Sequence, residues 1–459
     1  MKTQIYRWID DHKDELVETL RKTVSFASVS DKAGGKPGAP FGQADADCLA
    51  YVLGKAEELG FAVKNYDGYC GAVDFGEGEE QLGILAHLDV VPAGEDWKYP
   101  AYGGEIHGGE IFGRGTLDDK GPAIAALFAL AAVKAAKPET RRRVRIILGC
   151  DEECGMGCLT HYQTVEKDPD LAFSPDASYP LVNGEKTNFG SSYKKSFASS
   201  VRFTAGTVSN AVAGKAELLL PVGRAEVEKA IAACGFDPEF KFDLTEEDGK
   251  CRLIVTGVAA HASTPQFGKN AIYAALQLMS RLALPEEDLR TAQQLAAVLG
   301  FDEHGERLGI DCSDESGRLT TNVGIMNWDE SGIERMTMDI RAPNSADMEE
   351  ISGKLAEAFA KAGLQEEHHD YSRGYFIPED SELVSTLMGI YHDHFGPEGK
   401  PEVIGGGTYA RHLKNAVAFG PERPGEPALI HMANESIKIK HLIDDAKIYA
   451  DAILALACK

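Results

Sequence analysis

The stretch that decides the fold is residues 83–92, which read GILAHLDVVP. Residues 83–86 form a continuous apolar run, which is typical of a strand covered on both faces of a sheet. His87 follows at the carboxyl end of this strand, where ligands collect in α/β sheets. Asp89 lies one strand period further on, so it could hold the imidazole in the tautomer that a metal needs. A structural core histidine beside a turn aspartate is the alternative for this stretch alone.

The composition is that of an ordinary globular protein, with 43% hydrophobic and 26% charged residues. A length of 459 residues predicts roughly two to three domains. The longest apolar segment, residues 122–136, falls short of the ~20 residues of a membrane helix, and the first residues lack the apolar core of a secretion signal. Nine cysteines without the spacing of a small secreted scaffold fit reduced thiols, so we expect a cytoplasmic protein.

The charge of the chain limits its partners. A formal net charge of −25 argues against nucleic acid and anionic membranes, because both would be repelled. The dense basic cluster at residues 141–143 is expected in a solvated loop before a strand. Cys150, Cys154 and Cys158 are evenly spaced and leave a metal-binding or redox role open, although their i, i+4 helical spacing is not that of a C-x-x-C zinc knuckle.

Hydrophobic periodicity predicts alternating strands and helices in the first part of the chain and again at its end, which indicates an α/β sheet. The expected helices are 5–24, 44–59, 122–136, 381–395 and 442–458, and the expected strands are 71–75, 81–86, 144–149, 402–404 and 416–419. The middle of the chain, from residue 186 to residue 371, has shorter elements joined by polar turns and is expected to form a separate, inserted α+β domain. Its clearest elements are strands 216–220 and 252–257 and helices 224–234 and 270–282.

Four further places supply groups with the chemistry of metal ligands, each where a strand meets a loop. They are Asp118 and Asp119 in GRGTLDDKG, Glu152 and Glu153 after strand 144–149, Asp176 in SPDA, and His431 in IHMANE. Each is ambiguous alone, because an aspartate pair before a helix could cap it and a glutamate pair could be a solvated turn.

Taken together, these motifs resemble those of the di-zinc metallopeptidase family that includes peptidase V, carboxypeptidase G, aminoacylase and the succinyl-diaminopimelate desuccinylases. The resemblance runs from end to end through HLDVVP, GRGTLDDKGP, DEE, SPDA, AHASTPQFGKN and IHMANE. The chain is most similar to the peptidase V-type dipeptidases, because SPDA is followed by YPLVNGE and because it carries PQFGKN and VIGGGTY. The resemblance implies a mixed-sheet α/β catalytic domain of the zinc exopeptidase type, residues 1–185 and 372–459, with an inserted α+β lid domain, residues 186–371.

The same resemblance implies the metal ligands. His87 and Asp176 would hold one Zn²⁺, Glu153 and His431 would hold the other, and Asp118 would bridge them, with Mn²⁺ or Co²⁺ as alternative metals. Asp119 then becomes a residue behind the ligands or a helix cap. The set is chemically sound, because two ions ~3.5–4 Å apart need a shared ligand and zinc accepts mixed imidazole and carboxylate donors.

Glu152 is adjacent to a ligand without being one, so we expect it to act as the general base. Because neighbouring residues point differently, Glu153 can face a metal while Glu152 faces the attacking water.

The inserted domain contributes candidates for substrate binding. His261, in AAHASTP, and Asn210 would stabilise the oxyanion, as the resemblance implies, although a structural cap is the alternative for His261. Arg341 would bind the terminal carboxylate of the substrate through its guanidinium, with an ordinary surface arginine as the alternative. Gly406 and Thr408 lie in a glycine run that could be a phosphate loop, but we favour backbone contacts to the substrate.

The sequence therefore predicts a metal-dependent dipeptidase acting on unblocked dipeptides, in which a hydroxide held by two metals attacks the peptide carbonyl and Glu152 is the base. The nearest alternative is an N-acyl amino acid deacylase of the succinyl-diaminopimelate desuccinylase or aminoacylase type, since the chemistry at the metals is the same. A metal-binding or redox regulator that uses the three cysteines is an alternative of another class. The large lid resembles the arrangement of peptidase V and implies a monomer.

Overall fold

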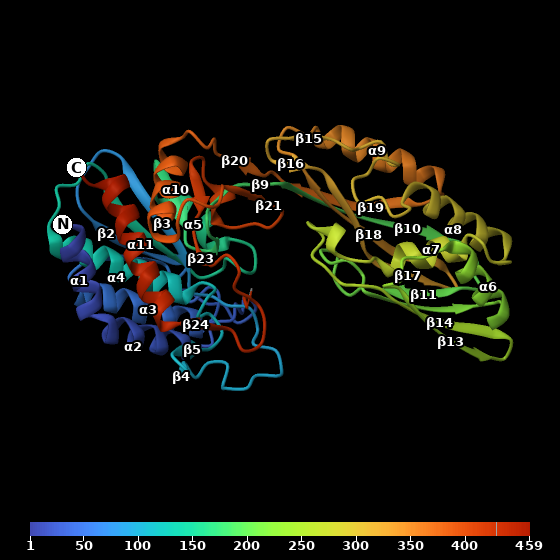
Figure 1. The fold of residues 1–459 in the computed structure, drawn as a ribbon, viewed down its shortest axis with the longest axis horizontal. Helices are drawn as coiled ribbons and strands as arrows, with labels where there is room; N and C mark the ends of the chain where they lie inside the picture. The colour runs from blue at the N-terminus through green and yellow to red at the C-terminus, as the bar shows by residue number, and fades with distance from the viewer. Residues whose placement is uncertain (428) are drawn as a thin grey trace. The chain divides into compact units, whose positions relative to one another are not determined.

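The computed structural model describes residues 1–427 and 429–459 (Figure 1). The chain folds into two compact units: unit 1 comprises Met1–Gly184, Ile377–Glu402 and Gly407–Lys459, and unit 2 comprises Glu185–Phe376 and Val403–Gly406. Unit 2 thus continues past residue 371 and takes a short piece of the returning chain. None of the described helices has the length and apolar character that crossing a membrane requires.

Unit 1 is built on a mixed sheet. Its strands are β1 (Ala62–Tyr66), β2 (Cys70–Phe75), β3 (Gln81–His87), β6 (Arg143–Gly149), β7 (Leu171–Ser174), β9 (Val182–Glu185) and β22 (Ala416–Ala418). They lie in the order β1-β2-β6-β3-β7-β22-β9, with β3 parallel to both β6 and β7 and with β2 antiparallel to β6. Every residue of β3 is buried, so both faces of this strand are covered, as its apolar run predicted. The expected mixed-sheet α/β fold is confirmed.

The helices of unit 1 join the beginning and the end of the chain. They are α1 (Lys2–Asp11), α2 (Lys13–Val24), α3 (Gln43–Glu58), α4 (Lys120–Ala136), α5 (Gly157–Val165), α10 (Glu382–Phe395) and α11 (Ile439–Ala457). The early helix α4 and the last helix α11 pack against each other and against β3 and β6 (Figure 1). The single helix expected over residues 5–24 is wrong, because the backbone of His12 leaves the helical region and separates α1 from α2.

Short elements complete unit 1. Strands β4 (Glu105–His107) and β5 (Glu110–Phe112) form a hairpin before α4, and β24 (Ser436–Lys438) pairs with β5. Strand β8 (Ala177–Ser178) pairs with β23 (Pro421–Glu422). The 3₁₀ helix η2 (Tyr409–His412) follows the glycine run, and strands β20 (Tyr375–Phe376) and β21 (Glu402–Ile404) lie where the chain passes from one unit to the other.

The basic cluster before β6 is solvated at Arg141 and Arg143, as expected from its sequence, but not at Arg142. Arg142 is only 9% exposed. Its guanidinium donates to the carboxylates of Glu80 and Glu382 at 2.6–2.9 Å and to the carbonyl of Leu456 at 2.8 Å. The arginine therefore ties the start of β6 to α10 and to the end of α11, because each of these elements offers it an acceptor.

Unit 2 is an α+β unit with one antiparallel sheet. Its strands are β10 (Thr187–Ser196), β11 (Arg202–Ala205), β12 (Lys215–Leu220), β13 (Lys241–Glu247), β14 (Lys250–Thr256), β17 (Thr320–Asp329), β18 (Gly332–Ala342) and β19 (Gln365–Ser372), in the order β13-β14-β12-β11-β17-β18-β10-β19. Alternate residues of β10 and β12 are buried, which indicates one covered face. The remaining elements are the hairpin β15 (Ser313–Asp314) and β16 (Gly317–Arg318), the 3₁₀ helix η1 (Pro265–Phe267), and the helices α6 (Arg224–Cys234), α7 (Ala271–Met279), α8 (Glu286–Val298) and α9 (Met348–Lys361).

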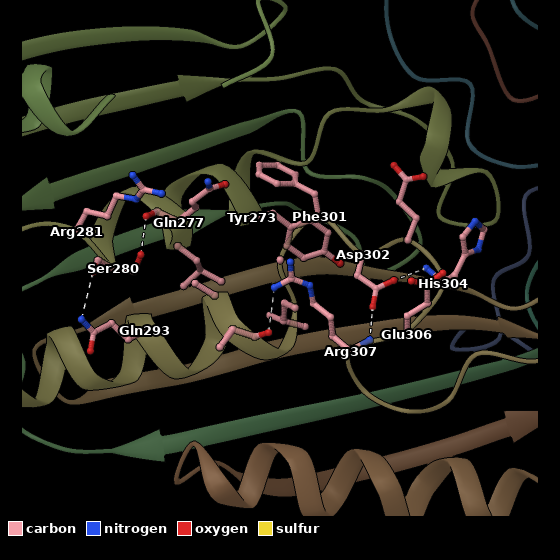
Figure 2. Close-up of a pocket in the computed structure, with 16 residues that line it drawn as sticks. Tyr273, Gln277, Ser280, Arg281, Gln293, Phe301, Asp302, His304, Glu306 and Arg307 are labelled. Carbon is pink, nitrogen blue, oxygen red and sulfur yellow. Dashed lines mark hydrogen bonds between the residues drawn. The ribbon is translucent and has the colours of Figure 1, made fainter. Parts of the chain in front are cut away.

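Unit 2 contains a cavity of about 660 Å³ that is lined by α7, α8 and the loop after α8 (Figure 2). The arginines of this cavity donate hydrogen bonds to main-chain carbonyls, Arg281 to that of Ala233 at 2.8 Å and Arg307 to that of Ala297 at 3.2 Å. The carboxylate of Asp302 accepts three main-chain N–H groups of its own loop. These charges stabilise the local fold, so we place no site there.

The start of α4 tolerates no side chain at Gly121. A Cβ at this position would lie 2.0 Å from the carbonyl oxygen of Thr116, whereas a Cβ at Gly54, in the middle of α3, would meet nothing within 4 Å. We expect Gly121→Ala to lower the free energy of unfolding by about 1–3 kcal/mol through steric strain. The matched control Gly54→Ala should raise it by about 0.5–1 kcal/mol, because alanine favours the helix. Urea unfolding followed by circular dichroism would measure both, and equal effects would contradict the prediction.

Candidate metal centre

The structure brings the five predicted ligands together in unit 1. His87 ends β3, Asp118 precedes α4, Glu153 follows β6, Asp176 follows β7 and His431 precedes β24. Three of these positions follow neighbouring parallel strands, whose carboxyl ends meet at one edge of the sheet. The pairing of β3, β6 and β7 therefore places three of the predicted ligands at one edge of the sheet.

Asp118 lies between the two histidines. Its Oδ1 is 3.0 Å from Nε2 of His87, and its Oδ2 is 3.0 Å from Nε2 of His431. The imidazole of His431 is also 3.0 Å from Oε1 of Glu153, and that of His87 is 3.8 Å from Oδ2 of Asp176. One carboxylate thus faces both halves of the cluster, which is the arrangement expected of a bridging ligand.

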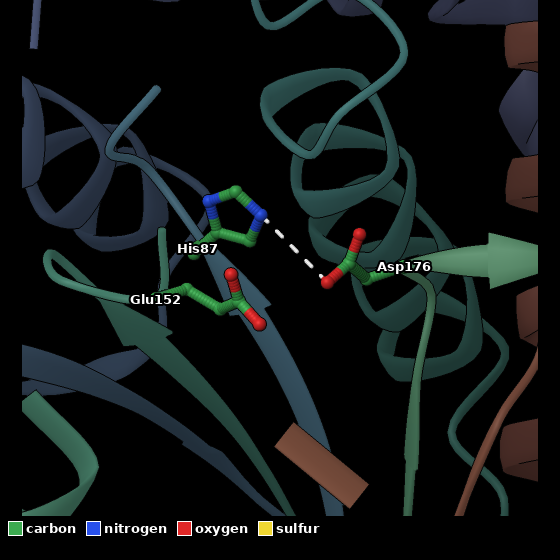
Figure 3. Close-up of side chains that lie close together, drawn as sticks. All are labelled: His87, Glu152 and Asp176. Atoms are coloured by element: carbon green, nitrogen blue, oxygen red, sulfur yellow. Dashed lines mark ion pairs between the residues drawn. The ribbon is translucent and has the colours of Figure 1, made fainter. Parts of the chain in front are cut away.

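Glu152 lies beside the cluster, as Figure 3 shows together with His87 and Asp176. One ligand atom from each of these three residues lies within 4.8 Å of the others, and the same holds for His87, Asp118 and Glu153. The carboxylate of Glu152 is therefore close enough to the ligands to act on a water or substrate atom held by them.

Asp89 contacts His87 mainly through its main chain. Nδ1 of His87 lies 2.9 Å from the carbonyl oxygen of Asp89 and 3.5 Å from its carboxylate. The two carboxylate oxygens instead accept the N–H groups of Glu152 and Glu153, each at 3.1 Å. The buried Asp89 side chain thus fixes the loop that carries the predicted base and a predicted ligand, and its main-chain carbonyl orients the imidazole.

Asp119 does not cap α4. Its side chain makes no cap hydrogen bond, and its Oδ2 accepts the main-chain N–H of His87 at 3.0 Å. Of the two alternatives for this residue, the helix cap is therefore wrong, and the carboxylate lies behind the ligands.

The acidic groups of the cluster are buried together. Burial raises the pKa of Asp176 well above its ordinary value, and the charge of Asp118 adds to this effect. Burial also raises the pKa of Glu152 to about 8. For Asp118 burial acts in the same direction, but hydrogen bonds with His431 and His87 hold its pKa well below the ordinary value. The cluster therefore concentrates acidic groups, whose charge the imidazoles of His87 and His431 partly oppose.

These residues fit divalent metal ions. Hydrogen bonds with Asp118 and Glu153 raise the pKa of His431 to about 10, because the carboxylates favour a positive charge on the ring. A metal cation supplies positive charge to such a site and binds the neutral imidazole. The donors, imidazole nitrogens and carboxylate oxygens, are those that zinc accepts.

Glu435 and Arg114 support the cluster, although the sequence did not predict a role for either residue. Glu435 is fully buried, and its Oε1 accepts the N–H groups of Gly115, Leu117 and Asp118 at 2.8–3.2 Å. Its Oε2 accepts from Nη1 of Arg114 at 2.7 Å. Both residues stand in motifs of the predicted site, but a sequence cannot show that these two charges meet.

The three evenly spaced cysteines do not form a helical series. Cys150 follows β6, Cys154 lies in the loop after it and is exposed, and only Cys158 lies in α5. The Sγ of Cys158 is 3.1 Å from the hydroxyl of Tyr409, and all nine cysteines are free thiols. This arrangement does not favour the alternative of a cysteine metal site.

Unit 2 places Asn210 and His261 side by side. Ala211 pairs with His261, and the carbonyl of Asn210 accepts the N–H of Ala262 at 3.0 Å. Nδ1 of His261 accepts the main-chain N–H of Ser263 at 3.2 Å, so a neutral ring carries its proton on Nε2. Burial and then the charge of Arg341 lower the pKa of His261, which favours that neutral ring.

Arg341 is buried, so its interpretation as an ordinary surface arginine is wrong. Its guanidinium forms two hydrogen bonds with the carboxylate of Asp339, at 2.7 and 2.8 Å, and donates to the carbonyl of Gly405. These bonds fix the plane of the guanidinium, which a bidentate contact with another carboxylate requires.

The predicted glycine run is divided between the units. Gly406 belongs to unit 2 and Thr408 to unit 1. The Thr408 hydroxyl accepts the N–H of Ala410 at 3.2 Å and so caps η2. A role of Gly406 and Thr408 in substrate binding stays a prediction.

Comparison with known proteins identifies the family. The model of peptidase family M20/M25/M40 matches residues 83–455. The chain is 34% identical to the putative dipeptidase YtjP of Bacillus subtilis, covering 97% of this chain and 98% of the relative, and 30% identical to the Beta-Ala-Xaa dipeptidase of Lactobacillus delbrueckii subsp. lactis, covering 97% and 96%.

Solved structures share the fold at low sequence identity. Human carnosine dipeptidase 1 is 17% identical, with a TM-score of 0.55 and coverage of 99% of both chains. The aminoacylhistidine dipeptidase of Vibrio alginolyticus is 16% identical, with a TM-score of 0.57 and coverage of 96% of this chain and 95% of the other. The resemblance predicted from the motifs is confirmed, and the chain belongs to peptidase family M20/M25/M40.

Proposed function

We propose that the protein is a metal-dependent dipeptidase that hydrolyses the peptide bond of unblocked dipeptides. The observation that carries this proposal is the buried cluster in which Asp118 faces both His87 and His431, with Glu152 beside it. Relatives named as dipeptidases match the chain over nearly its whole length, which supports the same reaction here.

The proposed cofactor is a pair of Zn²⁺ ions, with Mn²⁺ or Co²⁺ as alternatives. His87 and Asp176 would hold one ion, Glu153 and His431 the other, and Asp118 both. When bound, such ions polarise the scissile carbonyl and increase the acidity of water.

Glu152 performs the proton transfer in this proposal. Its carboxylate takes a proton from the attacking water and delivers it to the amine nitrogen as the C–N bond breaks. The hydrogen bonds from the N–H groups of Glu152 and Glu153 to Asp89 support this assignment, because they hold the base and the adjacent ligand in one fixed loop.

Unit 2 serves as the lid in this proposal. His261 donates from Nε2 to the oxygen of the reacting carbonyl, with Asn210 as a second donor. Arg341 binds the terminal carboxylate. Because the large lid resembles the arrangement of peptidase V, we propose that these residues serve the metal cluster of their own chain and that a monomer is active. The nine free thiols support the predicted cytoplasmic location.

Removing the base should abolish hydrolysis without removing the metal. We expect Glu152→Gln to lower kcat about 10²–10⁴-fold while the bound metal stays constant, because the amide keeps the shape but accepts no proton. Dipeptide hydrolysis and mass-spectrometric metal analysis would measure this. Glu57→Gln, at an exposed position of α3, is the matched control. Loss of metal together with activity would show that Glu152 is a ligand instead.

Metal binding should stabilise the fold through the cluster. At a free Zn²⁺ concentration of about 100 Kd, the free energy of unfolding should rise by about 2.7 kcal/mol per ion. We expect Asp118→Asn to lose most of this gain, because one carboxylate faces both histidines. Thermal unfolding of metal-free and metal-loaded protein would test it. A gain that is unchanged in Asp118→Asn would contradict the bridging role.

Arg341 should determine the preference for a free carboxylate. We expect Arg341→Lys to raise KM for a free dipeptide about 10-fold, because the ammonium cannot form the bidentate contact. The KM for the corresponding dipeptide amide, which lacks that carboxylate, should change little. Steady-state kinetics on this substrate pair would test the assignment, and an equal rise for both substrates would indicate a structural role only.

A further inference from the structure

The side chain of Glu422 points to the same side of the strand pair β8–β23 as that of Asp176, a predicted metal ligand. Strand β23 runs parallel to β8, with Pro421 opposite Ala177 and Glu422 opposite Ser178. Asp176 directly precedes β8, so Asp176 and Ser178 point to one face of the extended backbone, and Glu422 points with them. The pairing is held by the N–H of Tyr179, which donates to the carbonyl of Glu422 at 2.8 Å.

The carboxylate of Glu422 forms no ion pair within the described residues. Its Oε1 is buried and has no hydrogen-bond partner in the part of the chain that the structure describes. Neighbouring cations are engaged elsewhere: Arg423 pairs with Asp445 at 2.8 Å, and Lys438 with Glu426 at 2.7 Å. Burial raises the pKa of Glu422 and the charge of Asp118 adds to this, while His431 opposes it. A carboxylate in this position would be stabilised by an incoming cation.

Glu422 is among the residues that line a cavity of about 700 Å³ in unit 1. Leu117, which precedes the proposed bridging ligand, and Ser178, which follows β8's first residue, line this cavity too. The cavity therefore adjoins the loops of two ligands, and it offers room for a small organic group next to the metal cluster.

We propose that Glu422 binds the free ammonium group of the substrate and thereby makes the enzyme select unblocked dipeptides over N-acylated amino acids. This inference rests on the proposed function, because it assumes that a peptide bond is cleaved at the metal cluster. An ammonium would form a charge-assisted hydrogen bond with the carboxylate of Glu422. An acyl chain would supply no such donor and would leave Oε1 without a partner.

The test compares substrates that differ only in the ammonium. Alanyl-leucine and propionyl-leucine share one skeleton, and only the first carries the charge. We expect the metal-loaded wild type to prefer alanyl-leucine in kcat/KM. Glu422→Gln should lower kcat/KM for alanyl-leucine about 10–100-fold, mainly through KM, and should change that for propionyl-leucine by less than about twofold. The conservative variant Glu422→Asp should keep most of the preference.

The control is Glu398→Gln, which removes an exposed carboxylate from the lining of the same cavity and should keep the wild-type preference. Metal content and unfolding midpoint should match the wild type in all three variants. An equal loss on both substrates in Glu422→Gln, or an unchanged preference, would overturn the inference while leaving the dipeptidase proposal intact. A wild type that cleaves propionyl-leucine but no dipeptide would instead overturn the proposed function, and the inference with it.

Discussion

The site depends on one carboxylate that is shared by two histidines. Asp118 lies 3.0 Å from His87 through one oxygen and 3.0 Å from His431 through the other, and these histidines come from opposite ends of the chain. Such a contact forms only if the first and last parts of the chain fold into one unit. The packing of α4 against α11 and the pairing of β24 with β5 bring them together. The contacts within the cluster therefore form only when the first and last parts of the chain are folded together in unit 1.

The acidic residues behind the cluster stabilise loops through main-chain N–H groups. Asp89 accepts from Glu152 and Glu153, and Glu435 accepts from the loop of Asp118. A hydrogen bond to a charged group contributes about 1.5–3 kcal/mol, and more is lost when a buried charge has no partner. Each loop therefore has a strong preference for one conformation, which positions its ligand before a metal binds.

Features that depend on local patterns were predictable from the sequence. The apolar runs predicted β3 and β6, and the resemblance of the motifs to those of a known family implied the five residues that the structure brings together. Features that depend on distant contacts were not predictable. The sequence around Arg142 predicts a solvated side chain, but Arg142 donates to acceptors in α10 and α11, near the end of the chain. The ion pair between Arg114 and Glu435 likewise joins two motifs that are far apart in the sequence. The hydrophobic periodicity of a helix or strand cannot reveal such partners, because it shows only which face of that one element is buried.

The metal cluster alone cannot explain selectivity, because it acts on the scissile amide that dipeptides and N-acyl amino acids share. Discrimination must come from groups that meet the two ends of the substrate. The two groups that we propose for this purpose belong to different units, the partly buried carboxylate of Glu422 to unit 1 and the buried guanidinium of Arg341 to unit 2. Arg341 is already paired with Asp339, so a substrate without an ammonium would leave Oε1 of Glu422, rather than the guanidinium, without a partner. The two proposed contacts would together select for a substrate with a charge at each end, with the chemistry of cleavage unchanged between substrates.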